Sequence, residues 1–534
     1  MSLSLASKVH KKVKVVDVAT VIKAIPDNAV IATGGFVSTA IPEYIYRELA
    51  KNYRDTRHPA NLTLVYAAGQ GDGDSRGLNH LAEEGLVGQL IGGHYGLVPK
   101  LGKQVIAGKI KGYNLPQGVV SHLFRAIAGK KPLIISQVGL GTFVDPDFGG
   151  GKLNSITTEE LVGKVSIEGQ DYLTYKTFPI NVAILRGTLA DSAGNISLKR
   201  EALTTESLAI AMAAHNSGGI VIVQVERLVQ HGSLGAREVE IPGILVDYVV
   251  VSEEPDVTHQ QTFATRYSPS FSGEAKVPLE AIKPLPFSER KIIARRAAYE
   301  LRPYQVVNLG IGMPEGVSKV AAEEGLLDYV TLTTEPGAIG GIPAGGMDFG
   351  AADNPEAIID QPSQFDFYDG GGLDIAFLGL AQVDKEGNLN VSKFGPKLAG
   401  AGGFINISQN AKKVVYVGTF TAVGLEIQLE NSQLQIIQEG KQKKFVEEVE
   451  HRTFSGSVAY RKGQEVLYVT ERCVFRLCDG GIELIEIAPG VDLNKDILAH
   501  MDFVPQISPD LKLMDAAIFT PDFAGNHLHD AFCG

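Results

Sequence analysis

Apolar runs that end in glycine turns and lead into helical patterns recur along the chain. In the first half, the run at 29–32 breaks at a glycine turn, and a helix is expected to begin at Pro42, where proline suits the first turn. The segments expected to form strands in this half are 29–32, 62–66, 182–185 and 220–225. Strands that alternate with helical segments predict an α/β fold with open sheets.

The second half repeats the first. LTLVYAAG, from Leu62, parallels VTLTTEPG, from Val330, and VAILRGTLADSAGNIS, from Val182, parallels IAFLGLAQVDKEGNLNVS, from Ile375. A fold repeated in this order indicates two homologous α/β domains in one chain. We expect them to occupy residues 1–257 and 290–534, with the proline-containing stretch 258–289 as the linker between them.

The two copies differ at one position that bears on chemistry. Glu335 stands where the second-copy strand 330–334 ends, before Pro336 and a glycine-rich loop, whereas the first copy has Ala67. The carboxyl ends of strands are where open α/β sheets place their ligands, and glycines let backbone amides approach them closely. A carboxylate in one copy predicts a single active site for which the other copy supplies walls and hydrogen-bond donors.

Composition narrows the class of protein. The net charge of −12 argues against nucleic acid as a partner, since phosphate binding needs clustered lysine and arginine. No run approaches the roughly 20 apolar residues of a membrane span, and the start of the chain lacks the apolar core of a signal peptide. Three cysteines suit a reducing cytosol, and their spacing does not indicate a metal site. We therefore expect a cytoplasmic protein without metal.

The glycine motifs together resemble those of family I coenzyme A transferases, in which two related subunits are separate or fused. GGFVSTAIPE, from Gly34, is similar to the GGFG-type turn of the family, with Val37 at the last glycine. LPQG, from Leu115, is similar to its PQGT stretch, with Val119 in place of threonine. The resemblance extends over nearly the whole sequence.

The second half carries three further motifs of this kind. VNLGIGMP, from Val307, and GAGGFINIS, from Gly400, are similar to two glycine turns of the second subunit. TEPG, from Thr334, resembles the SENG stretch that carries the nucleophilic glutamate of the family. Proline in place of asparagine is a departure that a fused branch acting on acetate and similar short acids also shows.

The resemblance implies a ping-pong transfer of CoA between an acyl-CoA and a carboxylic acid. Glu335 attacks the thioester, which yields an acyl-glutamyl anhydride and CoA thiolate. The thiolate attacks the Glu335 carbonyl, which leaves a glutamyl-CoA thioester and a free acid, and a second acid reverses these steps. No permanently bound cofactor is implied, because the CoA thioester is the substrate.

A carboxylate is a weak nucleophile in water, so such a site needs a desolvated slot and donors for the developing oxyanion. Gln117 is the candidate side-chain donor, and the turn at Gly35 and Phe36 is expected to contribute backbone to the pocket. The positions expected to bind CoA are Gly310, Ile311, Gly312, Met313, Pro314, Gly402 and Gly403. His94 could face the pocket, although a loop histidine hydrogen-bonded within the protein is the favoured expectation.

Two alternatives remain open from the residues. The same site could pass the acyl group to water as a thioesterase, or the glycine turns could bind a sugar phosphate or nucleotide without catalysis. The resemblance implies a homodimer or homotetramer. It leaves the acid open among acetate, propionate, butyrate, lactate and acetoacetate.

Overall fold

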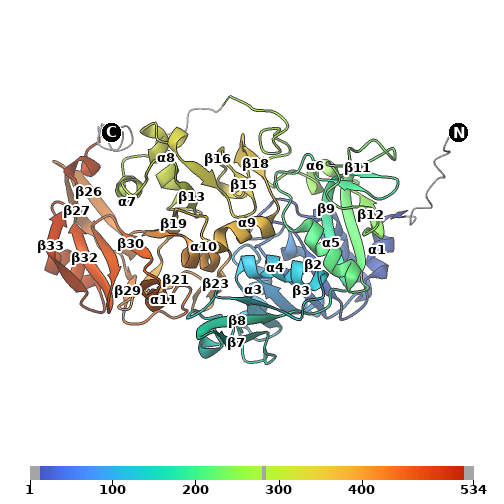
Figure 1. Ribbon diagram of the computed structural model, residues 1–534, viewed down its shortest axis with the longest axis horizontal. Helices are drawn as coiled ribbons and strands as arrows, with labels where there is room; N and C mark the ends of the chain where they lie inside the picture. Colours follow the sequence, from blue (N-terminus) through green and yellow to red (C-terminus); the bar gives the residue numbers. More distant parts are fainter. Residues whose placement is uncertain (1–12, 279–283, 522–534) are drawn as a thin grey trace.

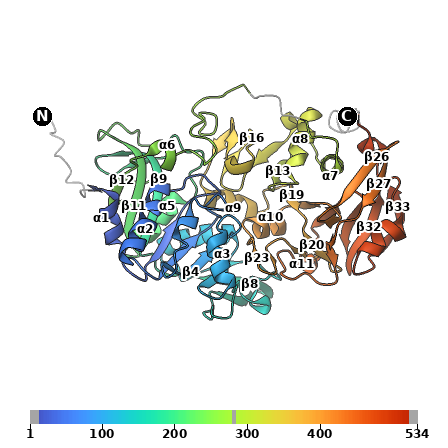
Figure 2. The ribbon, with the colours of Figure 1, turned by 180° about the vertical axis from the view of Figure 1, so that it is seen from behind.

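The computed structural model describes residues 13–278 and 284–521. Two halves, each built on its own sheet, lie next to one another along the long axis of the molecule (Figure 1 and, from behind, Figure 2). The first half runs from β1 (Lys14–Val15) to β12 (Tyr248–Val251) and the second from β13 (Val306–Leu309) to β33 (Gln506–Leu513). The predicted α/β fold with two open sheets is confirmed.

Nine strands form the first sheet. Besides β1 and β12 they are β2 (Val30–Thr33), β3 (Leu62–Tyr66), β4 (Val87–Gly92), β5 (Lys111–Asn114), β9 (Val182–Asp191), β10 (Ile196–Ser197) and β11 (Ile220–Val229). Their order is β1-β12-β11-β9-β2-β3-β4-β5, and β10 pairs antiparallel with β9. The other pairs are parallel, as their continuous apolar runs indicate.

Helices cover both faces of this sheet. They are α1 (Val18–Ala24), α2 (Glu43–Thr56) and α3 (Pro99–Ile106) on one face, and α4 (Gln117–Ala128) and α5 (Ser207–Asn216) on the other. Because successive strand residues point to opposite faces, Ile31 of β2 packs with α1 to α3 and its neighbour Ala32 with α4 and α5. A short helix, α6 (Pro255–Thr258), follows β12.

The second sheet has ten strands. Besides β13 and β33 they are β14 (Thr331–Thr333), β15 (Ala338–Ile339), β18 (Ala357–Ile358), β19 (Ile375–Gly379), β24 (Lys413–Val417), β30 (Glu465–Val469), β31 (Cys473–Cys478) and β32 (Gly481–Ile487). Helices α7 (Glu289–Ala298) and α8 (Glu315–Glu323) cover one face, and α9 (Gln361–Asp369) and α10 (Phe404–Asn410) the other. Helix α11 (Gly456–Arg461) precedes β30.

The strand order confirms the duplication. The parallel path β12-β11-β9-β2-β3 of the first sheet has its equivalent in β30-β24-β19-β13-β14 of the second. The pairing of β2 with β3 has the same register as the pairing of β13 with β14, since Thr63 pairs with Val30 and Thr331 pairs with Val306. Four residues beyond each threonine come Ala67 and Glu335, so the sequence match between these two positions also holds in space.

Smaller sheets of two or three strands lie outside the two main sheets. They are β6 (Leu133–Ser136), β7 (Val162–Ile167) and β8 (Gln170–Lys176) in the first half, and β16 (Ile342–Pro343), β17 (Ala352–Asp353), β20 (Gln382–Asp384), β21 (Leu389–Asn390), β22 (Lys393–Phe394), β23 (Lys397–Leu398), β25 (Thr421–Ala422), β26 (Glu426–Glu430), β27 (Gln433–Gln438), β28 (Gln442–Lys443) and β29 (Phe445–Val446) in the second. Part of the predicted glycine loop after Glu335 therefore forms β15 and β16, followed by the 3-10 turn at Gly346–Asp348.

The expected linker, 258–289, packs against the rest of the protein in the parts that the structure describes, which are 258–278 and 284–289. Thr262 and Ser270 are buried. The hydroxyl of Thr265 donates to the Asp348 carboxylate (3.1 Å), and Thr262 bonds the same side chain. This stretch therefore holds the loop that follows Glu335, rather than only joining two domains. The limits assigned to the domains stay a prediction.

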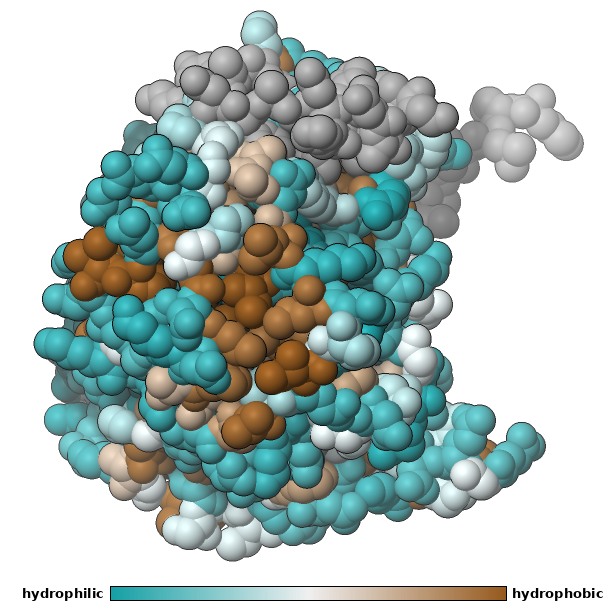
Figure 3. Space-filling model, turned by 90° about the vertical axis from the view of Figure 1, so that its left-hand side faces the viewer, coloured by the Kyte–Doolittle hydropathy of each residue, from teal (hydrophilic) through white to brown (hydrophobic). Residues whose placement is uncertain are grey.

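One end of the second half carries apolar side chains on its surface, as Figure 3 shows. Ile437 of β27 and Ile507 and Leu513 of β33 are exposed at this end. Across the described parts of the chain, every helix is too short or too polar to cross a bilayer.

Candidate active site

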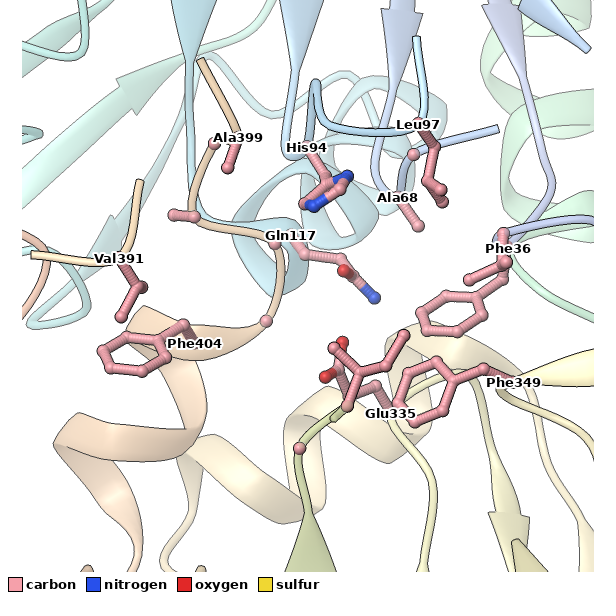
Figure 4. Close-up of a pocket in the computed structure, with 18 of the residues that line it drawn as sticks. Phe36, Ala68, His94, Leu97, Gln117, Glu335, Phe349, Val391, Ala399 and Phe404 are labelled. Carbon is pink, nitrogen blue, oxygen red and sulfur yellow. The ribbon is translucent and has the colours of Figure 1, made fainter. Parts of the chain in front are cut away.

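A pocket of about 350 Å³ lies between the halves. The first half contributes Phe36, Ala68, His94, Leu97 and Gln117 to its lining, and the second contributes Glu335, Phe349, Val391 and Phe404. Figure 4 shows Gln117 and Glu335 near its centre, reaching in from opposite halves. The pocket also contains the predicted Gly310, Ile311, Gly402 and Gly403, whereas Gly35, Gly312, Met313 and Pro314 do not line it.

Glu335 is held by a tight turn beyond β14. The Gly337 N–H donates to the Thr334 carbonyl (3.1 Å), which closes the turn around Glu335 and Pro336. The Thr334 hydroxyl donates to the Gly350 carbonyl (2.8 Å) and ties the far end of the glycine loop to the same point. These bonds fix the backbone under the carboxylate before any substrate arrives.

Buried hydroxyls support this turn from below. The Tyr368 hydroxyl donates to Thr333 Oγ1 (2.8 Å), which in turn donates to the Val307 carbonyl (3.1 Å). The Asn308 amide donates to the Tyr368 oxygen (3.3 Å). The strand end that carries Glu335 is therefore fixed by α9 and β13.

Gln117 comes from the opposite half, as the first residue of α4 after Pro116. Its backbone N–H donates to the Gly402 carbonyl (3.0 Å), so the start of the helix is joined to the glycine turn of the second half. Its side-chain amide lies 3.4 Å from Gln361 Oε1, and the Gln361 amide donates to Ser121 Oγ (2.8 Å). Gln117 is thus oriented by residues on both sides of the interface.

The environment of Glu335 is low in polarity. Burial raises the pKa of the carboxyl group to about 7, although hydrogen bonds from the Gln117 side chain and the Gly403 backbone N–H oppose this shift by stabilising the carboxylate. Desolvation makes a carboxylate more nucleophilic than it is in water. The arrangement is suited to covalent acyl transfer.

Position 403 needs a glycine because there is no room for a side chain beside Glu335. Its φ and ψ angles of −79° and −5° suit any residue, but a Cβ there would lie 2.6 Å from Glu335 Oε2. Gly402 plays a different part, since its φ of +55° favours glycine and its N–H donates to the Gly93 carbonyl (2.7 Å). Gly402 joins the halves, and Gly403 leaves room for the carboxylate.

In the turn before α8, the N–H groups of the two glycines have different hydrogen-bond partners. The Gly310 N–H donates to the Phe377 carbonyl (2.9 Å), and the Gly312 N–H donates to the Glu315 carboxylate (2.9 Å). Glu315 therefore occupies a donor that an anionic group at this helix start would use. Ile311, 58% exposed, lies at the edge of the pocket.

The turn after β2 contributes a ring to the pocket. The Phe36 N–H donates to the Thr39 carbonyl (3.0 Å), so an oxyanion role for this N–H would require that bond to open. The Phe36 ring packs beside Phe349, with ring centroids 5.9 Å apart. Gly35 has a φ of +148°, and a Cβ there would lie 3.1 Å from the Gln70 side chain.

Of the two expectations for His94, the structure supports the one in which it faces the pocket, and not the favoured one of a hydrogen-bonded loop histidine. His94 lines the pocket, and its Nδ1 atom is buried without a hydrogen-bond partner among the described residues. Burial lowers the pKa of the imidazole to about 4, so the ring is neutral near pH 7. Gly69 and Gly96 leave space for this ring, since a Cβ at either would lie 3.0 Å or less from it. The glycines around GGHYG were the available sign that a ring is enclosed there.

Comparison with known proteins places the chain in a family. A model described as Coenzyme A transferase matches residues 15–252. The caffeate CoA-transferase of Acetobacterium woodii is 49% identical, over 94% of this chain and 97% of that protein. The acetate CoA-transferase YdiF of Escherichia coli (strain K12) is 44% identical, with 98% of both chains covered.

Solved structures agree with these matches. The apoenzyme crystal structure of the acyl-CoA transferase YdiF from Escherichia coli O157:H7 matches with a TM-score of 0.91 and 43% identity, over 96% of this chain and 97% of that one. A thioester complex of the same enzyme with CoA matches with a TM-score of 0.89, 43% identity and 96% coverage of both chains. The chain therefore belongs to the coenzyme A transferase family and is a CoA-transferase.

Proposed function

We propose that Glu335 is the nucleophile of a ping-pong CoA transfer between an acyl-CoA and a free monocarboxylic acid. The observation that carries this proposal is the position of its carboxylate, which lines the pocket between the halves, where burial raises its pKa and the Gln117 side chain and the Gly403 backbone are near enough to stabilise its charge. The first copy has Ala67 at the matching strand end, so one such carboxylate serves the pair of sheets.

The steps follow from these positions. A Glu335 oxygen adds to the thioester carbonyl, and expulsion of CoA thiolate leaves an acyl-glutamyl anhydride. The thiolate then adds to the Glu335 carbonyl and displaces the acid, which forms the glutamyl-CoA thioester. Each addition places negative charge on a carbonyl oxygen, and the Gln117 amide and Gly403 N–H are the donors that stabilise it. The second acid reverses the sequence, and no proton is transferred to a general base.

The relatives guide the choice of substrates. The named acids of two relatives, acetate and caffeate, are both monocarboxylic and differ widely in size. A short acyl-CoA such as acetyl-CoA is therefore the donor we propose, with CoA as substrate rather than resident cofactor. Gly310 and Ile311 are proposed to contact the CoA arm, since both line the pocket where it meets the surface.

Three further parts of the proposal concern the whole protein. Domains at 1–257 and 290–534 are proposed from the two sheets and the repeat. A homodimer or homotetramer is proposed, supported by the apolar surface over β27 and β33 (Figure 3). A cytoplasmic location is proposed from the low cysteine content.

The test is mass spectrometry of the protein after incubation with acetyl-CoA. We expect a CoA adduct on the peptide that contains Glu335, and its loss, together with loss of transfer activity, in Glu335→Gln. Transfer at the wild-type rate by Glu335→Gln would refute the assignment. Exchange of labelled acetate into acetyl-CoA, measured against net hydrolysis, separates a transferase from a thioesterase. Binding of a sugar phosphate or nucleotide without any adduct would favour the non-catalytic alternative.

A further inference from the structure

His94 is the polar side chain of the pocket that the reaction steps leave unused. Among the described residues that line the pocket, the only polar side chains are those of His94, Gln117 and Glu335, and none of the others is a lysine or arginine. Glu335 is the reacting group, and the Gln117 amide lies beside it and 3.4 Å from Gln361 Oε1. His94 is therefore the one side chain of the lining that still has a hydrogen bond to offer a substrate.

Neither ring nitrogen of His94 has a hydrogen-bond partner among the described residues. Nδ1 is buried beside Gly69, where a Cβ would lie 2.6 Å from it, whereas Nε2 is not buried. A neutral imidazole has one N–H and one lone pair, and burial keeps this ring neutral at pH 7 by lowering its pKa to about 4. Because buried N–H groups without an acceptor are rare, the lone pair belongs on Nδ1 and the N–H on Nε2.

Backbone hydrogen bonds from the second half hold the loop that carries His94. The N–H groups of the two residues after His94 donate to the Ala399 carbonyl (2.7 and 2.9 Å). The carbonyl of the residue before it accepts from the Gly402 N–H (2.7 Å). The position of His94 is therefore set by the same turn that ends at Gly403, beside the nucleophile.

The ring stands close to the reacting group. A Cβ at Gly402 would lie 3.7 Å from His94 Cδ2 and 3.6 Å from Gln117 Oε1. A Cβ at the next residue, Gly403, would lie 2.6 Å from Glu335 Oε2. Figure 4 shows the imidazole on the same side of the pocket as Gln117, with Glu335 facing them from the second half. The imidazole and the carboxylate are thus neighbours of two consecutive residues of one turn.

The free acid is the substrate that needs a donor of this kind. When the acid enters, Glu335 is joined to CoA as a thioester and carries no charge, so the acid brings its own carboxylate into a lining without cations. A desolvated carboxylate is strongly unfavourable unless hydrogen bonds replace its hydration. The Gln117 amide and the Gly403 N–H serve the Glu335 carbonyl oxygen, on which charge develops. The Nε2–H of His94 is left for the acid.

We propose that His94 binds the carboxylate of the free acid through Nε2–H and keeps this hydrogen bond while the acid becomes an acyl group. This inference rests on the proposed function of Glu335. One oxygen of the acid adds to the Glu335 carbonyl carbon, the C–S bond breaks, and the negative charge passes to the CoA sulfur. The other oxygen, held by His94, becomes the acyl carbonyl of the anhydride. The thiolate then adds to that carbonyl, which gives acyl-CoA and the Glu335 carboxylate, and the imidazole gives up no proton.

The test is discharge of the preformed glutamyl-CoA adduct by two different nucleophiles. The full-length enzyme is loaded with acetyl-CoA, separated from small molecules and mixed with acetate or with hydroxylamine. Loss of CoA from the protein is followed by rapid quenching and mass spectrometry. Acetate needs a donor for its carboxylate, whereas hydroxylamine is uncharged and cleaves the thioester to a hydroxamate and CoA without one.

Three variants of His94 separate the hydrogen bond from the shape of the ring. In His94→Phe, the second-order rate constant for discharge by acetate should fall about 10- to 100-fold, the loss expected for a hydrogen bond to a charged group. The rate constant for hydroxylamine should stay within about twofold of the wild type. His94→Gln should restore most of the acetate rate, because its amide reaches the place of Nε2. His94→Asn, whose amide lies near the place of Nδ1, should behave like His94→Phe, and it is smaller than histidine and fits the same slot.

Tyr95→Phe is the matched control in the same loop. It removes a hydroxyl that donates to the Tyr113 carbonyl (2.5 Å) and leaves the lining of the pocket as it is. Both rate constants of this variant should equal those of the wild type.

The outcomes keep this inference apart from the proposed function. Equal slowing of acetate and hydroxylamine in His94→Phe and His94→Asn would show that the ring only supports the fold, and would overturn the role of His94. An unchanged acetate rate in both variants, or recovery in His94→Asn but not in His94→Gln, would overturn it as well. The equilibrium amount of adduct should match the wild type in every variant, because the hydrogen bond exists only while the acid is bound. Absence of the adduct in the wild type would instead refute the covalent mechanism at Glu335.

Discussion

Replacement of Gly403 by alanine tests the geometry of the nucleophile directly. The φ and ψ angles of Gly403 suit alanine, and the residue stands just before α10, so the backbone needs no change. The added Cβ would lie 2.6 Å from Glu335 Oε2 and 2.9 Å from its carboxyl carbon. The closest contacts are therefore with the reacting group, and the Ile407 methyl group, at 3.3 Å, must move by only a few tenths of an ångström.

The size of the effect follows from these distances. Carbon and oxygen atoms in close contact stay about 3.3 Å apart, so the carboxylate must retreat by roughly 0.7 Å. A misplacement of about 1 Å at a reacting centre can cost on the order of 100-fold in rate. We expect kcat of Gly403→Ala to fall about 30- to 100-fold, or about 2–3 kcal/mol in the activation barrier.

The assay is steady-state transfer from acetyl-CoA to butyrate, together with thermal unfolding. The unfolding temperature of Gly403→Ala should equal that of the wild type or rise slightly, because alanine restricts the unfolded chain more than glycine does. Gly102→Ala is the matched control, since Gly102 lies within α3 and its Cβ would meet only Tyr95, at 3.9 Å. Wild-type kcat in Gly403→Ala would refute the close approach of Gly403 to the nucleophile.

The remaining predictions concern the second donor and pH. Gln117→Ala removes a side-chain donor to Glu335, so kcat should fall about 100-fold with little change in KM for acetyl-CoA; a raised KM with unaltered kcat would contradict the donor role. Burial raises the pKa of Glu335 to about 7, and only the ionised form attacks. The value of kcat/KM should therefore fall about tenfold per pH unit below pH 7 and level off above it. A flat profile between pH 5.5 and 8 would contradict this.

The position of Glu335 at a strand end could be predicted because the information is local. A short β-branched run, the stop imposed by Pro336 and the match with Ala67 are all properties of neighbouring residues. The same holds for the two sheets, whose apolar runs and repeat are visible in the chain. The predicted ends of strands differ from the observed ones by about a residue, as in β2, which begins at Val30 rather than Ala29.

Other features depended on contacts between distant segments. The glycines beside His94 were a sign of an enclosed ring, but only the structure shows that this ring lies in the pocket and that the Glu315 carboxylate accepts from the Gly312 N–H. The sequence also suggested a linker where the structure has a packed segment whose hydroxyls bond Asp348. Such contacts depend on which surfaces the two halves bring together.

By itself, then, the sequence determined the α/β class, the duplication and the one carboxylate that the copies do not share. Only the tertiary structure decided what surrounds that carboxylate. The interface between the halves brings Gln117 and the Gly403 N–H to Glu335, encloses the site and raises the pKa of the carboxyl group to about 7. The physical reason is that desolvation and oxyanion stabilisation depend on atoms a few ångströms apart in space, whereas local pattern reports only on neighbours along the chain.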